Sequence, residues 1–310
     1  MQHSDDKLHP VAISQVMLNF ALRNGIDQQT CLLGTGISET ELSSGEGLVT
    51  RTQEMRLIEN LMLALPEVGV GGFELGLQYN LATFGVWGFA LRTCKTLRDA
   101  VALGLRYLPL STAYCRITVC EDGDAFGVIF DPDPIPPHLR QFLLERDMAT
   151  ALNLVREITF QGVEFRGVEF TGEPDVAASA IEALCGMAPA IHASANRILV
   201  NRAGASQPFP GYDPVLTRML EQKCQQRMDT VENSGLAGKV RQKLLGELGL
   251  GATLHDMASE LALSTRSLRR KLEQEGTSYR DLVEEERRQL ALHLLDSPTM
   301  KIEELAAHLG

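Results

Sequence analysis

The sequence predicts two domains, an α+β domain at the N-terminus and an all-α domain at the C-terminus. Two β-rich runs, Arg116–Cys120 and Ala125–Phe130, flank an Asp-Gly pair at residues 122–123, which is a strong signal for a β-hairpin. Most other apolar residues recur with the period of a helix, and from residue 236 onward every predicted element is a helix. A length of 310 residues is consistent with about two domains.

We place the N-terminal domain at residues 1–228, a linker at 229–235 and the C-terminal domain at 236–310. In the first domain the spacing predicts helices at Val11–Leu22, near Ile37–Thr40, and at Thr50–Leu65, Thr96–Tyr107, His138–Ile158, Pro174–Cys185 and Val215–Met228. Further strands are expected at Val163–Phe170 and Arg197–Val200. Helices outnumber strands, and the strands lack the even spacing that is typical of a β-barrel.

The composition indicates a globular protein of the cytoplasm. Hydrophobic residues make up 44% of the chain, which is ordinary for such a protein. No uninterrupted apolar run is long enough to cross a membrane, and the polar start MQHSDDKLHP lacks the basic and apolar regions of a signal peptide. The six cysteines include no C-x-x-C pair, so we expect them to be reduced.

The stretch Leu254–Gly276 is the most informative part of the chain. Its apolar residues fall on two stripes of helical period: Leu254, Met257, Ala258 and Leu261, then Leu268 and Leu272. This spacing predicts two short helices that are separated by a tight turn. Ser264 precedes the second helix, where its hydroxyl can accept a hydrogen bond from a free backbone N–H.

The second of these helices is strongly basic. With the two leucines turned to the core, the outward residues are Thr265, Arg266, Arg269 and Arg270, and Lys271 lies on the flank. Two short helices with a basic second helix are typical of the helix-turn-helix, whose second helix enters the DNA major groove. An ordinary helical hairpin with a solvated basic face is the alternative interpretation of this stretch alone.

The residues that follow make the pattern more specific. Tyr279–Asp296 is predicted to be one long helix, after which Ile302, Leu305, Ala306 and Leu309 repeat the spacing of the first apolar stripe. The order of helix-turn-helix, long connecting helix and a second helix-turn-helix resembles the layout of the AraC/XylS regulators. The segments that carry the resemblance are ALSTRSLRRKL, GTSYRDLVEEERRQLALHLL and KIEELAAHLG.

This resemblance implies a sequence-specific transcription regulator, an activator that binds double-stranded promoter DNA as a homodimer and contacts RNA polymerase. Ser264 and Thr265 would open its recognition helix. Arg266 and Arg269 match base-reading positions of the family, and Arg270 matches a position that commonly grips phosphate. Arginine suits both tasks, because its planar fork can pair with guanine O6 and N7 or with two phosphate oxygens.

Two departures from the family pattern affect this prediction. Ala262 occupies the turn position where the family often has glycine. A left-handed backbone there would penalise alanine by roughly 1 kcal/mol, so a different turn geometry is a second possibility. The sequence also ends at Gly310, within the turn of the second helix-turn-helix. We therefore expect its recognition helix to be missing and the DNA affinity of residues 1–310 to be reduced.

The N-terminal domain shows a second, less specific resemblance. Phe84-Gly85-x-x-Gly88, followed by a helix that opens at Thr96-Leu97, resembles the regulatory domain of the family branch that includes ornithine and virulence regulators. The resemblance implies control by a small-molecule effector, such as an amino acid or a fatty acid-like ligand.

Four residues are candidates for the effector pocket. Trp87, Tyr107 and Tyr114 could line it, although a place in the plain core is the more common role of an aromatic side chain. An anionic ligand would favour Arg92, or alternatively Arg106, because a guanidinium pairs well with a carboxylate.

Motifs for other classes of function are missing from the sequence. A phosphate loop, a dinucleotide turn, a G-x-S-x-G elbow and paired metal-binding histidines are not found, so we expect no enzyme, cofactor or metal site. The net charge of −11 does not argue against DNA, because only the surface that faces the phosphates must be positive. The alternative function is a small-molecule binding protein whose helical C-terminal region mediates protein–protein contacts.

Overall fold

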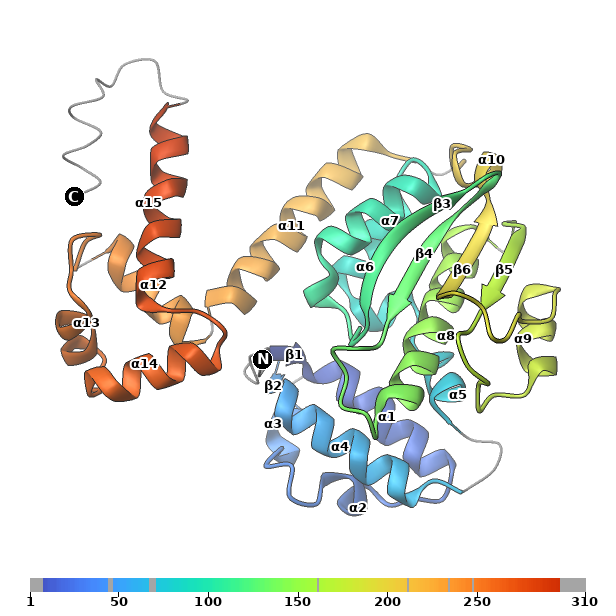
Figure 1. Cartoon of the computed structure of the whole chain (residues 1–310), viewed down its shortest axis with the longest axis horizontal. Helices are drawn as coiled ribbons and strands as arrows, with labels where there is room; N and C mark the ends of the chain where they lie inside the picture. The colour runs from blue at the N-terminus through green and yellow to red at the C-terminus, as the bar shows by residue number, and fades with distance from the viewer. Residues whose placement is uncertain are drawn as a thin grey trace. The chain divides into compact units, whose positions relative to one another are not determined.

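The computed structural model describes residues 8–43, 47–66, 71–160, 162–210, 212–233, 235–246 and 248–295 (Figure 1). They belong to two compact units. The N-terminal unit comprises His9–Met228, and the C-terminal unit comprises Asp229–Gly310 with the first residues up to Leu8. None of the helices in the described ranges is both long and apolar enough to cross a membrane.

The first part of the N-terminal unit is largely helical. Its helices are α1 (Val11–Arg23), α2 (Gln28–Leu32), α3 (Glu39–Ser43) and α4 (Arg51–Ala64), and β1 (Leu8–Pro10) pairs with β2 (Leu48–Thr50). The next helices are α5 (Gly72–Gly76), η1 (Leu81–Phe84), α6 (Val86–Thr93), α7 (Leu97–Arg106) and η2 (Leu108–Leu110). The small β1–β2 sheet was not predicted, because strands of three residues are too short to show an alternating pattern.

Two of the predicted helix starts in this part, at Thr50 and Thr96, are confirmed. The side chain of Thr50 accepts a hydrogen bond from the backbone N–H of Gln53 at 3.2 Å, and the Gln53 side chain accepts one from the Thr50 N–H at 2.9 Å. This reciprocal pair satisfies two backbone donors at the N-terminus of α4. Thr96 caps α7 in a similar way through the backbone N–H of Asp99.

A four-stranded antiparallel sheet forms the second part of the unit. Its strands are β3 (Arg116–Asp122), β4 (Ala125–Asp131), β5 (Phe165–Glu169) and β6 (Asn196–Asn201), in the order β3-β4-β6-β5. The predicted hairpin is confirmed, with Asp122 opposite Ala125 and Gly123 at a φ of 57°. The sheet is open and has two edges, in agreement with the prediction that the domain is no barrel.

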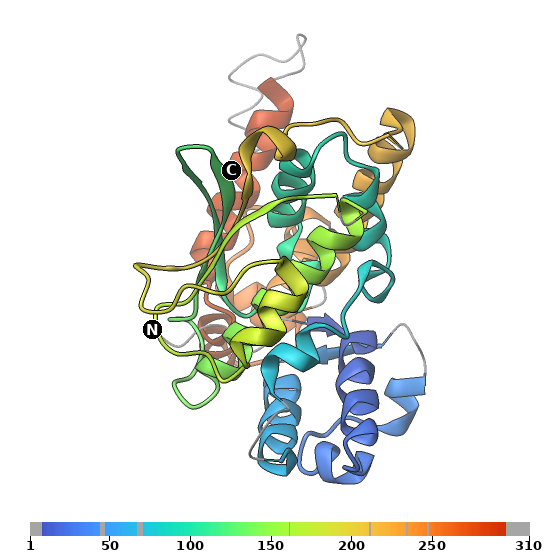
Figure 2. The ribbon, with the colours of Figure 1, turned by 90° about the vertical axis from the view of Figure 1, so that its right-hand side faces the viewer.

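Helices cover one face of this sheet (Figures 1 and 2). Phe126 of β4 and Val200 of β6 are buried against Leu97 of α7 and Val155 of α8 (Arg140–Ile158). The remaining helices are α9 (Ala178–Cys185), α10 (Arg202–Ala205) and α11 (Pro214–Asn233). The helix predicted from Pro174 begins only at Ala178, and α11 continues into the segment that was predicted as a linker.

The central helix α8 packs closely against α5. A methyl group at Gly72 would overlap the carbonyl oxygen of Phe142, and one at Gly76 would overlap that of Arg146. The hydroxyl of Thr150 donates to the Gly76 carbonyl oxygen at 3.2 Å. Glycine is therefore needed at both positions of α5, because any side chain would push the two helices apart.

A group of polar side chains is buried around Glu54 of α4. His9 Nδ1 contacts the Glu54 carboxylate, and the Tyr114 hydroxyl donates to the same oxygen at 2.9 Å. Burial alone would raise the pKa of Glu54, but the charges of His9 and Arg146 and the hydrogen bonds from His9 and Tyr114 hold it below the ordinary value. Glu54 is therefore a buried carboxylate that depends on its partners.

Arg146 of α8 completes this buried cluster. Its guanidinium is fully buried, pairs with Asp147 at 2.8 Å and also donates to the carbonyl oxygen of Thr112. Asp147 in turn accepts the backbone N–H groups of Tyr114 and Cys115 at 2.7 and 2.8 Å. The cluster therefore fixes α8 to the segment that leads into β3, while Glu54 fixes that segment to β1 and α4.

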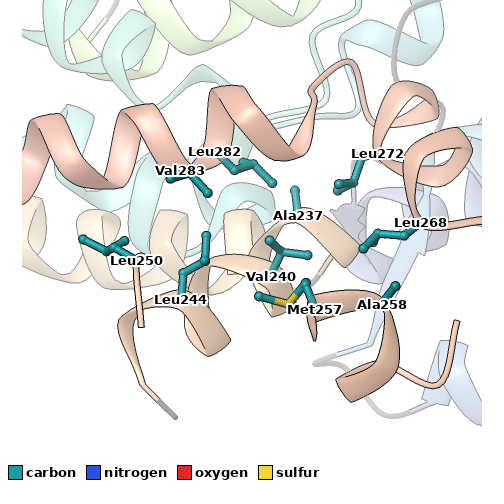
Figure 3. Packing of buried hydrophobic residues seen from close by; sticks show 10 residues of the cluster. All are labelled: Ala237, Val240, Leu244, Leu250, Met257, Ala258, Leu268, Leu272, Leu282 and Val283. Atoms are coloured by element: carbon teal, nitrogen blue, oxygen red, sulfur yellow. The ribbon is translucent and has the colours of Figure 1, made fainter. Parts of the chain in front are cut away.

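The C-terminal unit consists of helices in its described part, as predicted. They are α12 (Leu236–Leu245), α13 (Leu254–Glu260), α14 (Thr265–Gln274) and α15 (Tyr279–Leu295). Their buried apolar residues form one core, seen in Figure 3: Ala237, Val240, Leu244, Leu250, Met257, Ala258, Leu268, Leu272, Leu282 and Val283. The predicted repeat at residues 302–309 lies outside the described residues, as do the side chains of residues 290, 291, 294 and 295.

The turn between α13 and α14 contains a left-handed alanine. Ala262 has a φ of 53°, and its backbone N–H donates to the Ser259 carbonyl oxygen at 3.1 Å. Leu263 N–H then donates to Ala258 at 2.8 Å, which closes the end of α13. Of the two expected possibilities, the left-handed backbone at Ala262 is therefore confirmed.

We predict that Arg146→Met destabilises the N-terminal unit, because it leaves Asp147 buried without its ion-pair partner and removes one of the charges that stabilise the buried carboxylate of Glu54. At neutral pH the free energy of unfolding should fall by about 3–5 kcal/mol in denaturant titrations. Arg156→Met on the same helix is the matched control, since Arg156 is half-buried and has no hydrogen bond or ion pair among the described residues. It should change the free energy by less than about 1 kcal/mol.

The destabilisation caused by Arg146→Met is predicted to depend on pH. The pKa of Glu54 is lower in the folded protein than its ordinary value, so its ionised form stabilises the fold above that value. This contribution is lost as the pH falls through the folded-state pKa. The difference between wild type and Arg146→Met should therefore narrow on acidification. A difference that stays constant from pH 7 to the acid transition would contradict this account.

We also predict that Ala262→Gly stabilises the C-terminal unit. Glycine adopts a positive φ without strain, so the free energy of unfolding should rise by about 1 kcal/mol. Ala252→Gly, at a residue with no positive φ, serves as the control and should give no gain. Both variants can be compared in thermal and urea unfolding, and equal effects would show that the φ of Ala262 is not the cause.

Candidate nucleic-acid interface

The helix α14 begins at a capped turn. Ser264 has an extended backbone, and its hydroxyl accepts a hydrogen bond from the Ser267 N–H at 3.0 Å. The same hydroxyl contacts that of Ser267 at 2.9 Å. The cap was predicted from the position of serine before the second apolar stripe, and it fixes the residue at which the helix starts.

Two leucines set the orientation of α14. Leu268 and Leu272 have 0% exposure and lie in the core with Met257 and Ala258 of α13 (Figure 3). Positions 266, 269 and 270 consequently face away from the core, and their arginines are exposed. Thr265, at the first position of the helix, is half-buried.

The basic side chains of α14 have no acidic partner. Among the described residues, neither hydrogen bonds nor ion pairs engage the side chains of Arg266, Arg269, Arg270 and Lys271. Other cations of the C-terminal unit are paired: Arg241 with Glu286 at 3.3 Å, Arg280 with Glu284 at 2.8 Å and Arg288 with Glu285 at 2.8 Å. The exposed face of α14 therefore carries uncompensated positive charge that is available to a polyanion.

Two contacts that the sequence did not reveal connect the helices of the C-terminal unit. The Glu275 carboxylate, just beyond the helix, accepts the backbone N–H groups of Leu236 and Ala237 at 2.7 Å each. The Tyr279 hydroxyl donates to the Ala252 carbonyl oxygen at 2.7 Å. Both contacts bridge residues that are far apart in sequence, and no local spacing pattern signals them.

The aromatic candidates for the effector pocket lie in the core of the N-terminal unit. Trp87, Tyr107 and Tyr114 are 3–4% exposed. Tyr107 donates to Gln225 at 3.2 Å, and Tyr114 donates to Glu54 as part of the buried cluster. The indole N–H of Trp87 has no hydrogen-bond partner among the described residues. The structure thus gives two of these residues, Tyr107 and Tyr114, polar contacts within the protein.

Arg92 has a different environment from these aromatics. It is exposed, and its guanidinium lies 5.0 Å from the centre of the Phe160 ring. Phe160 also lines a surface hollow of about 300 Å³, together with Asn153, Arg156 and Glu157. Phe160 is 62% exposed and has a positive φ of 52°, which is unusual for a bulky residue.

The alternative cation, Arg106, already has an acidic partner within the protein. Its guanidinium forms an ion pair with Glu221 of α11. On a separate point, the described residues contain no group of three or more His, Cys, Asp or Glu side chains that could hold a metal ion. Arg92 is thus the candidate that keeps its charge free of an acidic partner in the part of the chain that the structure covers.

Comparison with known proteins places these features in a family. Residues 25–209 match the family described as the arabinose-binding domain of AraC transcription regulator, N-terminal. An uncharacterized HTH-type transcriptional regulator of Mycobacterium tuberculosis is 30% identical over 307 residues, which cover 97% of this chain and 89% of that protein. The ornithine utilization regulator of Pseudomonas aeruginosa is 26% identical, with coverage of 98% and 90%.

A solved structure also resembles this chain. It is the crystal structure of the transcriptional regulator CdpR from Pseudomonas aeruginosa, with 21% identity, a TM-score of 0.49 and coverage of 96% of this chain and 90% of that one. The family match spans more than half of the chain, and the mycobacterial relative is similar over nearly its whole length. The chain therefore belongs to the AraC family of HTH-type transcriptional regulators and carries an arabinose-binding-like N-terminal domain.

Proposed function

We propose that this regulator binds DNA sequence-specifically by placing α14 in the major groove. The observation that carries the proposal is the exposed basic face of α14, which follows a capped turn and has no acidic partner in the described residues. Cations that are already free of carboxylates can neutralise phosphates without first breaking ion pairs. A helical region that only contacted other proteins would not need four such cations on one short helix.

The first turns of α14 supply the proposed base contacts. Residues at the N-terminal end of a recognition helix reach base edges, which favours Thr265, Arg266 and Arg269 for this role. Arg270 is proposed to hold the phosphate backbone, and Ser264 is proposed to contact the DNA at the start of the helix. One bidentate pair between arginine and guanine discriminates against a wrong base by about 1–3 kcal/mol.

We further propose that a small-molecule effector controls this activity. The relative named as an ornithine utilization regulator favours an amino acid or another small carboxylate. The hollow beside Phe160 supports an anionic ligand, because Arg92 and Arg156 flank an exposed ring and have no acidic partner in the described residues. Glu157 in the same hollow is available to an ammonium group, although one of its oxygens accepts the Leu81 N–H at 3.1 Å.

Two copies of the chain are proposed to bind neighbouring half-sites and to act on RNA polymerase. Regulation then requires that the effector bind the two states of the protein differently, typically by about 1–3 kcal/mol. The N-terminal unit supplies the effector site in this proposal, and the C-terminal unit supplies the DNA contacts.

Two arginine variants test the DNA-binding role. Arg269→Ala should relax sequence preference by about 1–3 kcal/mol, because it removes a base contact. Arg270→Ala should weaken binding to all sequences alike and reduce the slope of log affinity against log salt by about 1, because it removes a phosphate contact. Both can be measured by gel shift on a randomised duplex library at several salt concentrations.

Arg288→Ala is the matched control for these variants, since Arg288 is paired with Glu285. It should leave both sequence preference and salt slope unchanged. If Arg269→Ala and Arg270→Ala behave like this control, α14 does not face the duplex and the proposed orientation is wrong.

The effector proposal is tested by thermal unfolding with L-ornithine and, separately, decanoate as probes. A probe at 100 times its dissociation constant should stabilise the protein by about 2.7 kcal/mol. Arg92→Ala and Arg156→Ala should each abolish this increase in stability. Arg140→Ala, at the first residue of α8 and thus on the same helix as Arg156, is the control and should retain it. A shift that survives in both hollow variants would place the ligand elsewhere.

A further inference from the structure

The two edges of the N-terminal sheet differ in how they are protected. Beyond β5, Ala190 N–H donates to Val168 and Phe170 N–H donates to Ala190, and the β5–β6 register is broken between Phe165 and Gly167. The opposite edge is β3. No other strand pairs with it on its outer side in the described part of the chain, so its outward backbone groups have no partner there.

The sequence of β3 does nothing to block pairing at this edge. The strand has seven residues in unbroken register with β4 and contains neither proline nor a bulge. Its centre is Ile117-Thr118-Val119-Cys120, which favours an extended backbone, and Val119 is 47% exposed. Natural edges usually carry proline, a bulge or central lysine to prevent such pairing. The charges of β3 stand at its ends instead.

We propose that β3 pairs antiparallel with β3 of a second copy, so that the two sheets become continuous across a twofold axis. The inference extends the proposed function, in which two copies bind neighbouring half-sites, by assigning the surface that joins them. The pairing itself needs no DNA.

Geometry restricts the possible registers. A continuous antiparallel sheet with a twofold axis perpendicular to it keeps the helix-covered face of both copies on the same side. Residues directly opposite each other must then point to the same face, and successive residues of a strand point to opposite faces. The twofold axis therefore lies midway between one residue of β3 and the same residue of the second copy, and this residue is described below as being on the axis.

Charge selects one of these registers. With Val119 on the axis, Arg116 lies opposite Asp122 of the second copy, and the twofold axis repeats the pair. With Thr118 or Cys120 on the axis, no opposite charges face each other. Opposite charges in directly facing positions stabilise a sheet, and like charges destabilise it.

The charged ends of β3 are accessible for these contacts. Arg116 and Asp122 side chains are 62% and 70% exposed. Each has an internal partner, Asp131 at 3.1 Å for Arg116 and Arg197 at 3.7 Å for Asp122. The resulting arrangement across the axis would be a row of alternating charges, because carboxylate and guanidinium groups can each serve two partners.

Cysteine cross-linking tests the register directly. Opposite residues have Cα atoms about 4.5 or 5.5 Å apart, within the range of a disulfide, whereas diagonal residues lie about 7–8 Å apart. In a background with Cys120→Ser and Cys185→Ser, Val119→Cys should form a covalent dimer on mild oxidation. Thr118→Cys is the matched control and should remain monomeric on a non-reducing gel, because residue 118 faces residue 120 of the second copy.

Sedimentation equilibrium tests the pairing without cysteines. The single swaps Arg116→Asp and Asp122→Arg should each raise the dimer dissociation constant by about tenfold, and the double swap should restore it. Val119→Lys should give a monomer. Arg166→Asp on the opposite edge is the control and should have no effect, and thermal unfolding verifies that every variant folds.

Three results would overturn the proposal: a wild-type monomer at all concentrations, a dimer that Val119→Lys leaves intact, or cross-linking of Thr118→Cys in place of Val119→Cys. Capture of a different protein by a monomeric chain would also refute it. DNA binding, measured separately on the same variants, distinguishes the two proposals. A dimer without DNA affinity contradicts the proposed function alone, whereas DNA binding by a chain with no β3 dimer contradicts only this inference.

Discussion

The N-terminal unit depends on the fully buried guanidinium of Arg146. It is the cation that lies between two buried carboxylates, Asp147 at 2.8 Å and Glu54 within electrostatic reach. Through them it connects α8, α4, β1 and the segment before β3, four pieces that come from widely separated parts of the sequence. A buried charge is tolerated only when its partners hold the correct geometry, so the cluster specifies how the helical and sheet parts meet.

The C-terminal unit could be predicted in detail because its information is local. The period of the apolar residues gave both short helices, Ser264 marked the start of α14, and the buried positions Leu268 and Leu272 fixed which side chains face outward. Each inference needed residues within a few turns of one another. The left-handed backbone at Ala262 could be anticipated as one of two possibilities only, because alanine itself gives no signal for a positive φ.

The N-terminal unit was predictable as elements but not as an assembly. Helix and hairpin signals placed α1, α4, α8 and the β3–β4 hairpin, yet no spacing connects His9, Glu54 and Arg146. For the same reason the hydrogen bond from Tyr114 to Glu54 could not be predicted from the sequence. Sequence distance conceals such contacts, and they become visible only when the topology brings the segments together.

The position of Glu275 couples the start of α12 to the end of α14. This carboxylate stands immediately after α14 and binds the first backbone N–H groups of α12, the point at which the polypeptide enters the C-terminal unit from α11. The incoming chain and the far end of the basic helix thus share one hydrogen-bonded anchor. A displacement of the backbone at Leu236 therefore acts on the end of α14 through this contact as well as through the apolar core that α12 and α14 share.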